Sequence, residues 1–161
     1  MAISTDEYKQ LLGSWATGVT IVTARAGDHI HGMTVTAFTE VSLDPPLVLV
    51  CAAKSSNTHP VIEEGGVFAV NILGSDQQDL SNRFASKKDE HKRFEGVKYD
   101  SGATGAPLLE DALGVLDCRV VSAHDEGDHI IYVGEVEQLR VTGREPLIYF
   151  RGKYSTVSEL A

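Results

Sequence analysis

The sequence predicts a mainly β protein with peripheral helices, arranged as an antiparallel barrel or sandwich. About seven segments alternate apolar and polar residues or are rich in β-branched side chains, as strands are. Only two or three short helical patterns accompany them, without the regular strand–helix alternation of a doubly wound sheet. No G-x-G-x-x-G run follows the first strand, which argues against a Rossmann dinucleotide site. The 161 residues suit a single domain with its own core.

Composition excludes several classes of partner. Lysine and arginine total 14 against 23 acidic residues, a formal net charge of −9. This balance repels phosphate backbones and anionic lipids, so we expect no nucleic acid or membrane partner. The N-terminus lacks the basic and apolar regions of a secretory signal, and no apolar stretch approaches membrane-spanning length. We therefore expect a cytoplasmic protein, in which Cys51 and Cys118 are reduced and buried.

The N-terminal segment predicts a helix followed by strands. Ser4 and Glu7 have the spacing of a capping box. An apolar helical face follows at i, i+3, i+4 and i+7, formed by Tyr8, Leu11, Leu12 and Trp15. We expect strands or extended segments over Gly18–Ala24, over His29–Leu43 and over Leu47–Ala53, the last buried on both faces.

The remaining chain alternates short helices and strands. Pro60 and Gly65-Gly66 predict the start and end of a helix near Thr58, and Val67–Leu73 reads as a strand. Ser75 or Asp76 is expected to cap a helix that runs through Phe84. The mixed charge run 86–95 predicts a solvated loop. Further strands are expected over 113–123, 130–141 and 146–150.

The clearest functional signal runs from Gly32 to Thr58. A strand with small and hydroxyl side chains, Thr34–Phe38, precedes an apolar strand that ends in Lys54-Ser55-Ser56-Asn57-Thr58. Donors and one cation at a strand end, before a helix, favour an anion site. Together the two strands predict a cradle for a flat aromatic ring with a phosphate. The alternatives stay open: threonine alternates in ordinary strands, and serine and asparagine are common in turns.

Histidines offer candidates but no decisive pattern. Gly-Asp-His occurs twice, at 27–29 and at 127–129, each time before a strand. Both copies could be simple hairpin turns. No histidine or cysteine pair has the spacing of a structural zinc site, so no metal is expected. The absence of G-x-S-x-G gives no support to a hydrolase.

Several runs, in order along the chain, resemble the short-chain flavin reductases, which are the reductase components of two-component flavin-dependent monooxygenases. The resemblance rests on the runs at 16–23, 31–38, 42–50, 68–73, 127–129 and 152–154. It extends from about Tyr8 to Tyr154, and implies one flavin reductase domain over 1–161 with its core at about 8–154. It also implies a split β-barrel fold of the FMN-binding type, a homodimer, and hydride transfer from NADH or NADPH to FMN or FAD. The reduced flavin would supply a partner monooxygenase.

The resemblance also implies site residues. The flavin contacts carried over are Thr34, Val35, Thr36, Ala37, Phe38, Cys51, Ala52, Ala53, Lys54, Ser55, Ser56, Asn57, Thr58, Ser81, Asn82, Arg83 and Phe84. The nicotinamide-side motif falls on Gly127, Asp128 and His129, and the C-terminal aromatic on Tyr154. The copy at 127–129 is thereby the functional one, and the copy at 27–29 a hairpin. The segment 86–95 departs from the family, which varies in length there.

These assignments carry expected roles. Thr34 and Thr36 would hold the ring, residues 54–58 the ribityl and phosphate groups, and His129 the nicotinamide nucleotide. Few cations cluster where a 2′-phosphate would sit, which mildly favours NADH over NADPH. The sequence leaves open FMN against FAD, and a bound against a diffusing flavin. The main rival is a flavin-binding module for storage or sensing without turnover. A pyridoxamine-phosphate-type oxidase would want more arginines and lysines than one lysine in the cradle.

Overall fold

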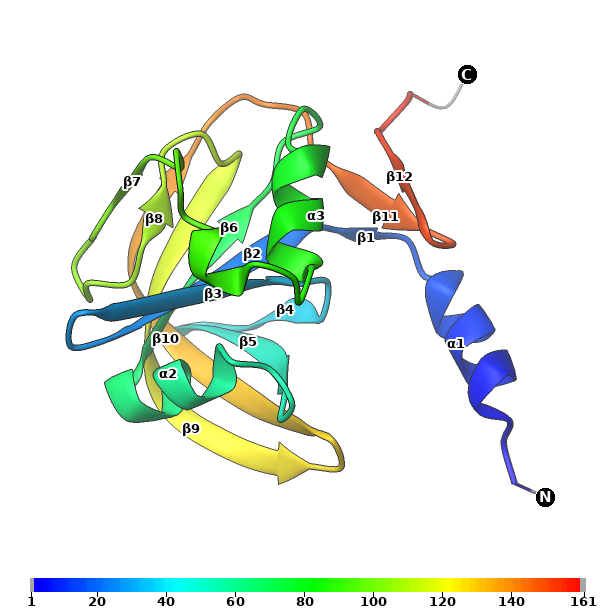
Figure 1. Ribbon diagram of the computed structural model, residues 1–161, viewed down its shortest axis with the longest axis horizontal. Helices are drawn as coiled ribbons and strands as arrows, with labels where there is room; N and C mark the ends of the chain where they lie inside the picture. The colour runs from blue at the N-terminus through cyan, green and yellow to red at the C-terminus, as the bar shows by residue number, and fades with distance from the viewer. Residues whose placement is uncertain (1, 160–161) are drawn as a thin grey trace.

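The computed structural model describes residues 2–159 and is dominated by one curled antiparallel sheet (Figure 1). Its seven strands lie in the order β3-β2-β6-β9-β10-β5-β4. They are β2 (Thr20–Ala26), β3 (His29–Val35), β4 (Phe38–Leu43), β5 (Pro46–Ala53), β6 (Val67–Ile72), β9 (Gly114–Glu126) and β10 (His129–Val141). The mainly β, antiparallel architecture predicted from the sequence is confirmed.

Smaller elements surround this sheet. The strands β1 (Thr17–Gly18), β11 (Ile148–Phe150) and β12 (Lys153–Ser155) form a second sheet, and β7 (Tyr99–Asp100) pairs with β8 (Leu108–Leu109). The helices are α1 (Thr5–Gly13), α2 (His59–Gly65), α3 (Gln78–Ala85) and the 3₁₀ turn η1 (Glu90–Lys92). In Figure 1, α2 and α3 flank the sheet, whereas α1 extends away from it. No helix among residues 2–159 is both long and apolar enough to span a membrane.

The two edge strands of the large sheet are consecutive in the chain. The long extended segment expected over His29–Leu43 is interrupted at Thr36-Ala37, and β3 and β4 pair with opposite ends of the sheet. The Phe38 amide donates to the Thr36 carbonyl at 3.0 Å, and the Cys51 amide donates to the Ala37 carbonyl at 3.0 Å. The crossing between the edges is therefore fixed against β5.

Two hydrophobic clusters pack on opposite faces of the central strands. Val22 and Val70 point into one cluster, and Ile21 and Ala69 into the other, so that β2 and β6 are buried on both faces. The prediction that Leu47–Ala53 is buried on both faces is wrong. On β5 only Val48, Val50 and Ala52 face the core, and the intervening side chains are half-buried on the outer face.

The termini of two helices test the capping predictions. Ser4 accepts a hydrogen bond from the Glu7 amide at 3.4 Å, as expected at the start of α1. The predicted cap of α3 by Ser75 or Asp76 is wrong, because the helix begins at Gln78 after Gln77. The carboxylate of Asp76 instead pairs with Arg144 at 3.4 Å.

The charge run 86–95 is not a solvated loop throughout. It contains η1, and Arg93 is only 5% exposed. Phe94 packs edge-on against Phe84 of α3, with ring centroids 5.2 Å apart. Charged and aromatic side chains therefore attach this segment to the domain, although the pattern of charges alone predicts solvation.

Candidate functional site

Five residues expected at the flavin meet in one cavity of about 330 Å³ between β3, α3 and the second sheet. They are Thr34, Thr36, Ser81, Asn82 and Tyr154. Val19, Ala85, Tyr149 and Gly152 complete the lining. The fold thus brings together residues from four separate parts of the sequence.

Hydrogen bonds fix the walls of this cavity. Thr34 Oγ1 donates to the Ser81 carbonyl at 2.6 Å, which ties β3 to α3. The Tyr154 hydroxyl donates to Asn82 Oδ1 at 2.9 Å and lies 2.8 Å from Ser81 Oγ. Because tyrosine carries a single hydroxyl proton, Ser81 is the donor in the second bond. Within residues 2–159 the exposed Thr36 hydroxyl has no partner and is free for a ligand.

Thr36 also borders a larger cavity of about 900 Å³ on the outer face of the sheet. Leu49 and Cys51 of β5 form part of its floor, and Ala37 and Phe38 lie at the crossing between the edge strands. The size is within the range of cofactor sites, about 300 to 1,000 Å³. Apolar side chains beside free hydroxyl and backbone groups fit a flat heteroaromatic ring with polar edges. The half-buried outer face of β5 thus has a physical explanation.

Most side chains of the polar turn 54–58 form hydrogen bonds or ion pairs within the protein. Lys54 Nζ pairs with Asp125 and donates to the Gly127 carbonyl at 2.8 Å. Asn57 Nδ2 donates to Glu90 Oε2 at 2.9 Å, and Ser56 Oγ accepts from the amide that opens α2 at 3.1 Å. Among the described residues, the Ser55 hydroxyl is the one side-chain group of this turn without a hydrogen-bond partner in the protein. The turn is therefore an ordered platform, not a cluster of free donors.

The nicotinamide-side motif forms the turn between β9 and β10. Gly127 adopts a φ of +61°, which favours glycine, and Asp128 is exposed. His129 Nδ1 lies 2.6 Å from Asp128 Oδ1. The hydrogen bond from His129, followed by its charge, holds the pKa of Asp128 below its ordinary value. Because the ionised carboxylate only accepts, Nδ1 carries the proton and Nε2 is left for a ligand.

Strand register brings this motif to the polar turn. His129 pairs with Ala53, and the Lys54 amide donates to the Asp128 carbonyl at 3.0 Å. Two residues further along, Ile131 pairs with Cys51 in the floor of the large cavity. His129 itself lines neither of the two cavities. The copy at 27–29 forms the β2–β3 hairpin instead, where Gly27 has a φ of +57°.

Five expected contacts are buried in the protein: Val35, Ala52, Thr58, Ser81 and Phe84. Phe84 packs against Gly32, where an added Cβ would lie 2.9 Å from its ring. The small residue at Gly32 is thus explained by helix packing. Arg83, in contrast, is exposed and donates to the Glu95 carbonyl at 3.0 Å.

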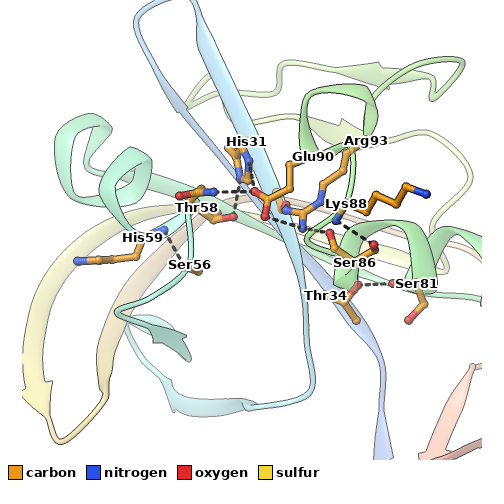
Figure 2. A network of polar contacts seen from close by, with 12 residues as sticks. His31, Thr34, Ser56, Thr58, His59, Ser81, Ser86, Lys88, Glu90 and Arg93 are labelled. Atoms are coloured by element: carbon orange, nitrogen blue, oxygen red, sulfur yellow. Dashed lines mark hydrogen bonds and ion pairs between the residues drawn. The ribbon is translucent and has the colours of Figure 1, made fainter.

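A buried charged network joins the polar turn to the segment 86–95 (Figure 2). His31 Nε2 lies 3.2 Å from Glu90 Oε2, and His31 Nδ1 lies 2.7 Å from Thr58 Oγ1. Arg93 donates to the Gly32 carbonyl at 2.7 Å and lies 3.6 Å from Glu90 Oε1. The ionised Glu90 only accepts, so neutral His31 carries its proton on Nε2 and accepts from Thr58.

Burial, and then the nearby Arg93, lower the pKa of His31, although Glu90 opposes this shift. The hydrogen bond from Asn57 and the charge of Arg93 lower the pKa of Glu90 despite its desolvation. The folded protein therefore favours a neutral histidine beside an ionised glutamate.

Sequence reasoning missed several residues around these cavities. Trp15 and Leu12 line the large cavity, and Tyr149 lines both cavities. The sequence contains a signal for the first two, because both belong to the apolar helical face predicted near the N-terminus. In the structure, α1 contains no buried residue and Trp15 is 76% exposed. Among residues 2–159, no group of three acidic, histidine or cysteine side chains could hold a metal ion.

Comparison with known proteins gives relatives along nearly the whole chain. An NADH-dependent flavin reductase of Rhodococcus sp. is 42% identical over 155 residues, covering 94% of this chain and 86% of the relative. The HsaB reductase subunit of a flavin-dependent monooxygenase from Mycobacterium tuberculosis is 37% identical over 153 residues, covering 93% of this chain and 81% of the relative.

Solved structures share the fold at similar coverage. The flavin reductase PheA2 superimposes with a TM-score of 0.90 at 35% identity, over 98% of this chain and 100% of that one. The Streptomyces globisporus NADH:FAD oxidoreductase SgcE6, in complex with NAD and FAD fragments, has a TM-score of 0.89 at 31% identity, over 98% and 97% of the two chains. The family model for the flavin reductase like domain matches residues 12–158. The chain belongs to the flavin reductase like domain family.

Proposed function

We propose that this protein is an NADH-dependent flavin reductase that supplies reduced FMN or FAD to a partner monooxygenase. The observation that carries the proposal is the cavity in which Thr34, Thr36, Ser81, Asn82 and Tyr154 converge. Its support comes from relatives described as an NADH-dependent flavin reductase and as a monooxygenase reductase subunit.

When bound, the two cofactors supply the chemistry, which is hydride transfer from the nicotinamide to the flavin. The protein aligns the rings and excludes water from between them. The free Thr36 hydroxyl and nearby amides donate to the polar edge of the flavin, while Leu49 and Cys51 support its apolar part. Tyr154, held by Ser81 and Asn82, closes the end of the smaller cavity.

His129 positions the nicotinamide nucleotide in this proposal. Asp128 fixes the proton on Nδ1, and Nε2 is then presented in a defined state to an amide or phosphate of NADH. Residues 54–58 hold the ribityl and phosphate groups through Ser55 and backbone amides. A phosphate there competes with Asp125 for Lys54, so flavin binding should weaken with salt.

The finer architecture belongs to the same proposal. We infer a split β-barrel, because the edge strands β3 and β4 are adjacent in the chain and close one side of the curled sheet. We infer one domain and a homodimer, since Leu11 and Trp15 expose an apolar face that a second copy would bury. A cytoplasmic location fits two free cysteines and the use of NADH.

Mixing the purified protein with NADH and either FMN or FAD tests the function. We expect loss of absorbance at 340 nm that requires flavin and is faster with NADH than with NADPH. Flavin binding without NADH oxidation, under any combination, would indicate a storage or sensing module instead. The absorption spectrum of the purified protein distinguishes a resident flavin, which is yellow, from a diffusing one.

A further inference from the structure

A second hollow, of about 430 Å³, lies beside the proposed flavin site. It is lined by Arg83, Ser86, Lys88, Asp89, Lys92 and Glu95. Arg83 belongs to the α3 stretch assigned to the flavin, and the other residues belong to the segment that departs from the family. The proposed function gives this hollow no role.

The hollow concentrates positive charge in an acidic protein. Five of the 14 lysines and arginines lie within residues 83–93, although the whole chain has a net charge of −9. Arg93 is paired with Glu90 and the Gly32 carbonyl in the buried network. Within residues 2–159, Arg83, Lys88 and Lys92 form no ion pair. Unpaired cations around a concave surface attract anionic groups.

Arg93 of the buried network anchors the segment 86–95, which forms most of the lining of the hollow. Arg93 bridges the Gly32 and Ser86 carbonyls, so both ends of the segment are attached to the sheet side of the domain. Figure 2 shows the Lys88 side chain extending away from Glu90 and Arg93. Lys88 is therefore left for an external partner, while the backbone that carries it is anchored. A binding wall that is ordered in advance costs less entropy when a ligand binds.

The hollow is also connected to the proposed phosphate turn. Glu90 stands between Asp89, which lines the hollow, and Asn57, to which it is hydrogen-bonded at 2.9 Å. A ligand whose first phosphate lies at residues 54–58 can thus continue across the 3₁₀ turn into the hollow. FMN ends at that first phosphate, whereas FAD continues into a second phosphate and an adenosine.

We infer that this hollow receives the adenylate half of FAD, and that the protein reduces FAD in preference to FMN. The inference rests on the proposed flavin reductase function and specifies its substrate. Arg83, Lys88 and Lys92 bind the second phosphate. The carboxylates of Asp89 and Glu95 would repel a bare phosphate, but they accept hydrogen bonds from ribose hydroxyls and the adenine amino group. The mixed lining therefore matches a nucleotide better than an inorganic anion.

Steady-state kinetics of the full-length protein with saturating NADH test this inference. For the parent we expect a KM for FAD about tenfold below the KM for FMN, a difference of about 1.4 kcal/mol. The double variant Lys88→Gln/Lys92→Gln should raise the ratio of the FAD KM to the FMN KM about tenfold. The matched control is Lys87→Gln, an exposed lysine of the same segment that does not line the hollow, and it should leave the ratio unchanged. ADP should inhibit FAD reduction by the parent competitively, and the double variant less strongly.

Three results would overturn the inference while leaving the proposed function intact. One is an equal KM for FMN and FAD in an active parent. Another is an equal rise for both flavins in the double variant, which would place the lysines at the shared phosphate. The third is a rise confined to the KM for NADPH, which would assign the hollow to a 2′-phosphate. A parent inactive with both flavins would instead refute the proposed function.

Discussion

His129 combines an exposed ring with a fixed proton, and both follow from its neighbour. Its side chain is 44% exposed, yet Asp128 holds Nδ1 at 2.6 Å. A histidine oriented in this way can recognise a ligand without becoming a general acid or base. Hydride transfer requires no proton relay from this residue, so its contribution should be to nucleotide binding.

Replacing His129 with alanine should therefore raise the KM for NADH while flavin affinity is largely kept. We expect about a tenfold rise, equivalent to the loss of one good hydrogen bond to a charged or polar group. Steady-state kinetics measure the KM for NADH, and equilibrium titration with flavin measures the flavin affinity. Replacing His29 in the other Gly-Asp-His turn is the control and should change neither. Equal losses of NADH and flavin binding would show a structural role for His129.

His31 provides a prediction about stability and pH. Burial lowers its pKa below the ordinary value of 6.5, which the unfolded chain regains. Between the folded and the unfolded pKa, the unfolded state binds more protons, and stability falls as the pH drops below 6.5. Glu90 acts in the same direction at lower pH, because its folded pKa lies below 4.5. Its contribution is present above 4.5 and is lost as the pH falls through the folded pKa.

Urea unfolding from pH 7.5 down to pH 5.5 would test this behaviour. The free energy of unfolding of the parent should fall across this range, and that of His31→Gln should fall less. His91→Gln, which changes an exposed histidine of the adjoining turn, should keep the slope of the parent. Parallel curves for the parent and His31→Gln would contradict the assigned neutral state.

At the scale of elements, the contact between α3 and β3 decides where the ring end of the site lies. Phe84 fits against Gly32, and Thr34 on the same strand donates to the Ser81 carbonyl on the same helix. The packing contact and the hydrogen bond therefore together fix the distance between α3 and β3. A change in how the helix packs should be transmitted to Ser81 and Asn82 in the cavity.

Gly32→Ala should destabilise the protein by about 1 to 3 kcal/mol, because its Cβ would lie 2.9 Å from the Phe84 ring. Phe84→Leu in the same chain provides room for the added methyl group. The double variant should consequently be more stable than the sum of the two single changes predicts, by about 0.5 kcal/mol or more. Denaturant unfolding of the four proteins measures this coupling, and strict additivity would show that the contact is unimportant.

Element by element, the sequence predicts the strands better than it predicts their burial. Alternation and β-branching locate 67–73, 113–123 and 130–141 correctly because these signals are local. They do not separate β5, half-buried on one face, from β6, buried on both, since both runs are apolar. The same limit applies to Arg93, whose burial depends on the carbonyls of Gly32 and Ser86. The sequence identifies the polar residues at 54–58 as a candidate site. It does not predict that Lys54 and Asn57 bond to Asp125 and Glu90, because these partners lie far along the chain.

At the scale of the whole molecule, large apolar side chains on α1 and just after it are exposed. Leu11 is 70% exposed and Trp15 is 76% exposed, values unusual for large apolar side chains that lie together. Leu12 and Trp15 also line the large cavity. A second copy bound there would cover the opening of that cavity and exclude water from the ring. The helix is predictable from the spacing of its apolar residues. Its position outside the domain is not, because this spacing does not specify what the apolar face packs against.

We expect the protein to sediment at about twice its chain mass of 17.4 kDa. Leu11→Asp should shift it toward the monomer and weaken flavin reduction, because a charge cannot be buried cheaply in an apolar interface. Gln10→Asp adds the same charge on the opposite side of the helix and should leave the dimer intact. A parent that sediments as a monomer at micromolar concentration would contradict the proposed assembly.

The pairing of the strands has a consequence for how the protein acquires activity. The hairpins β2–β3, β4–β5 and β9–β10 join neighbours in the sequence, whereas β5 and β10 are far apart in the chain. The β5–β10 ladder places His129 against Ala53 and Lys54 against the Gly127 carbonyl. Loop closure of this length is entropically costly and slow compared with hairpin formation. A newly synthesised chain can hold each motif in its local hairpin and still be inactive until this ladder is formed.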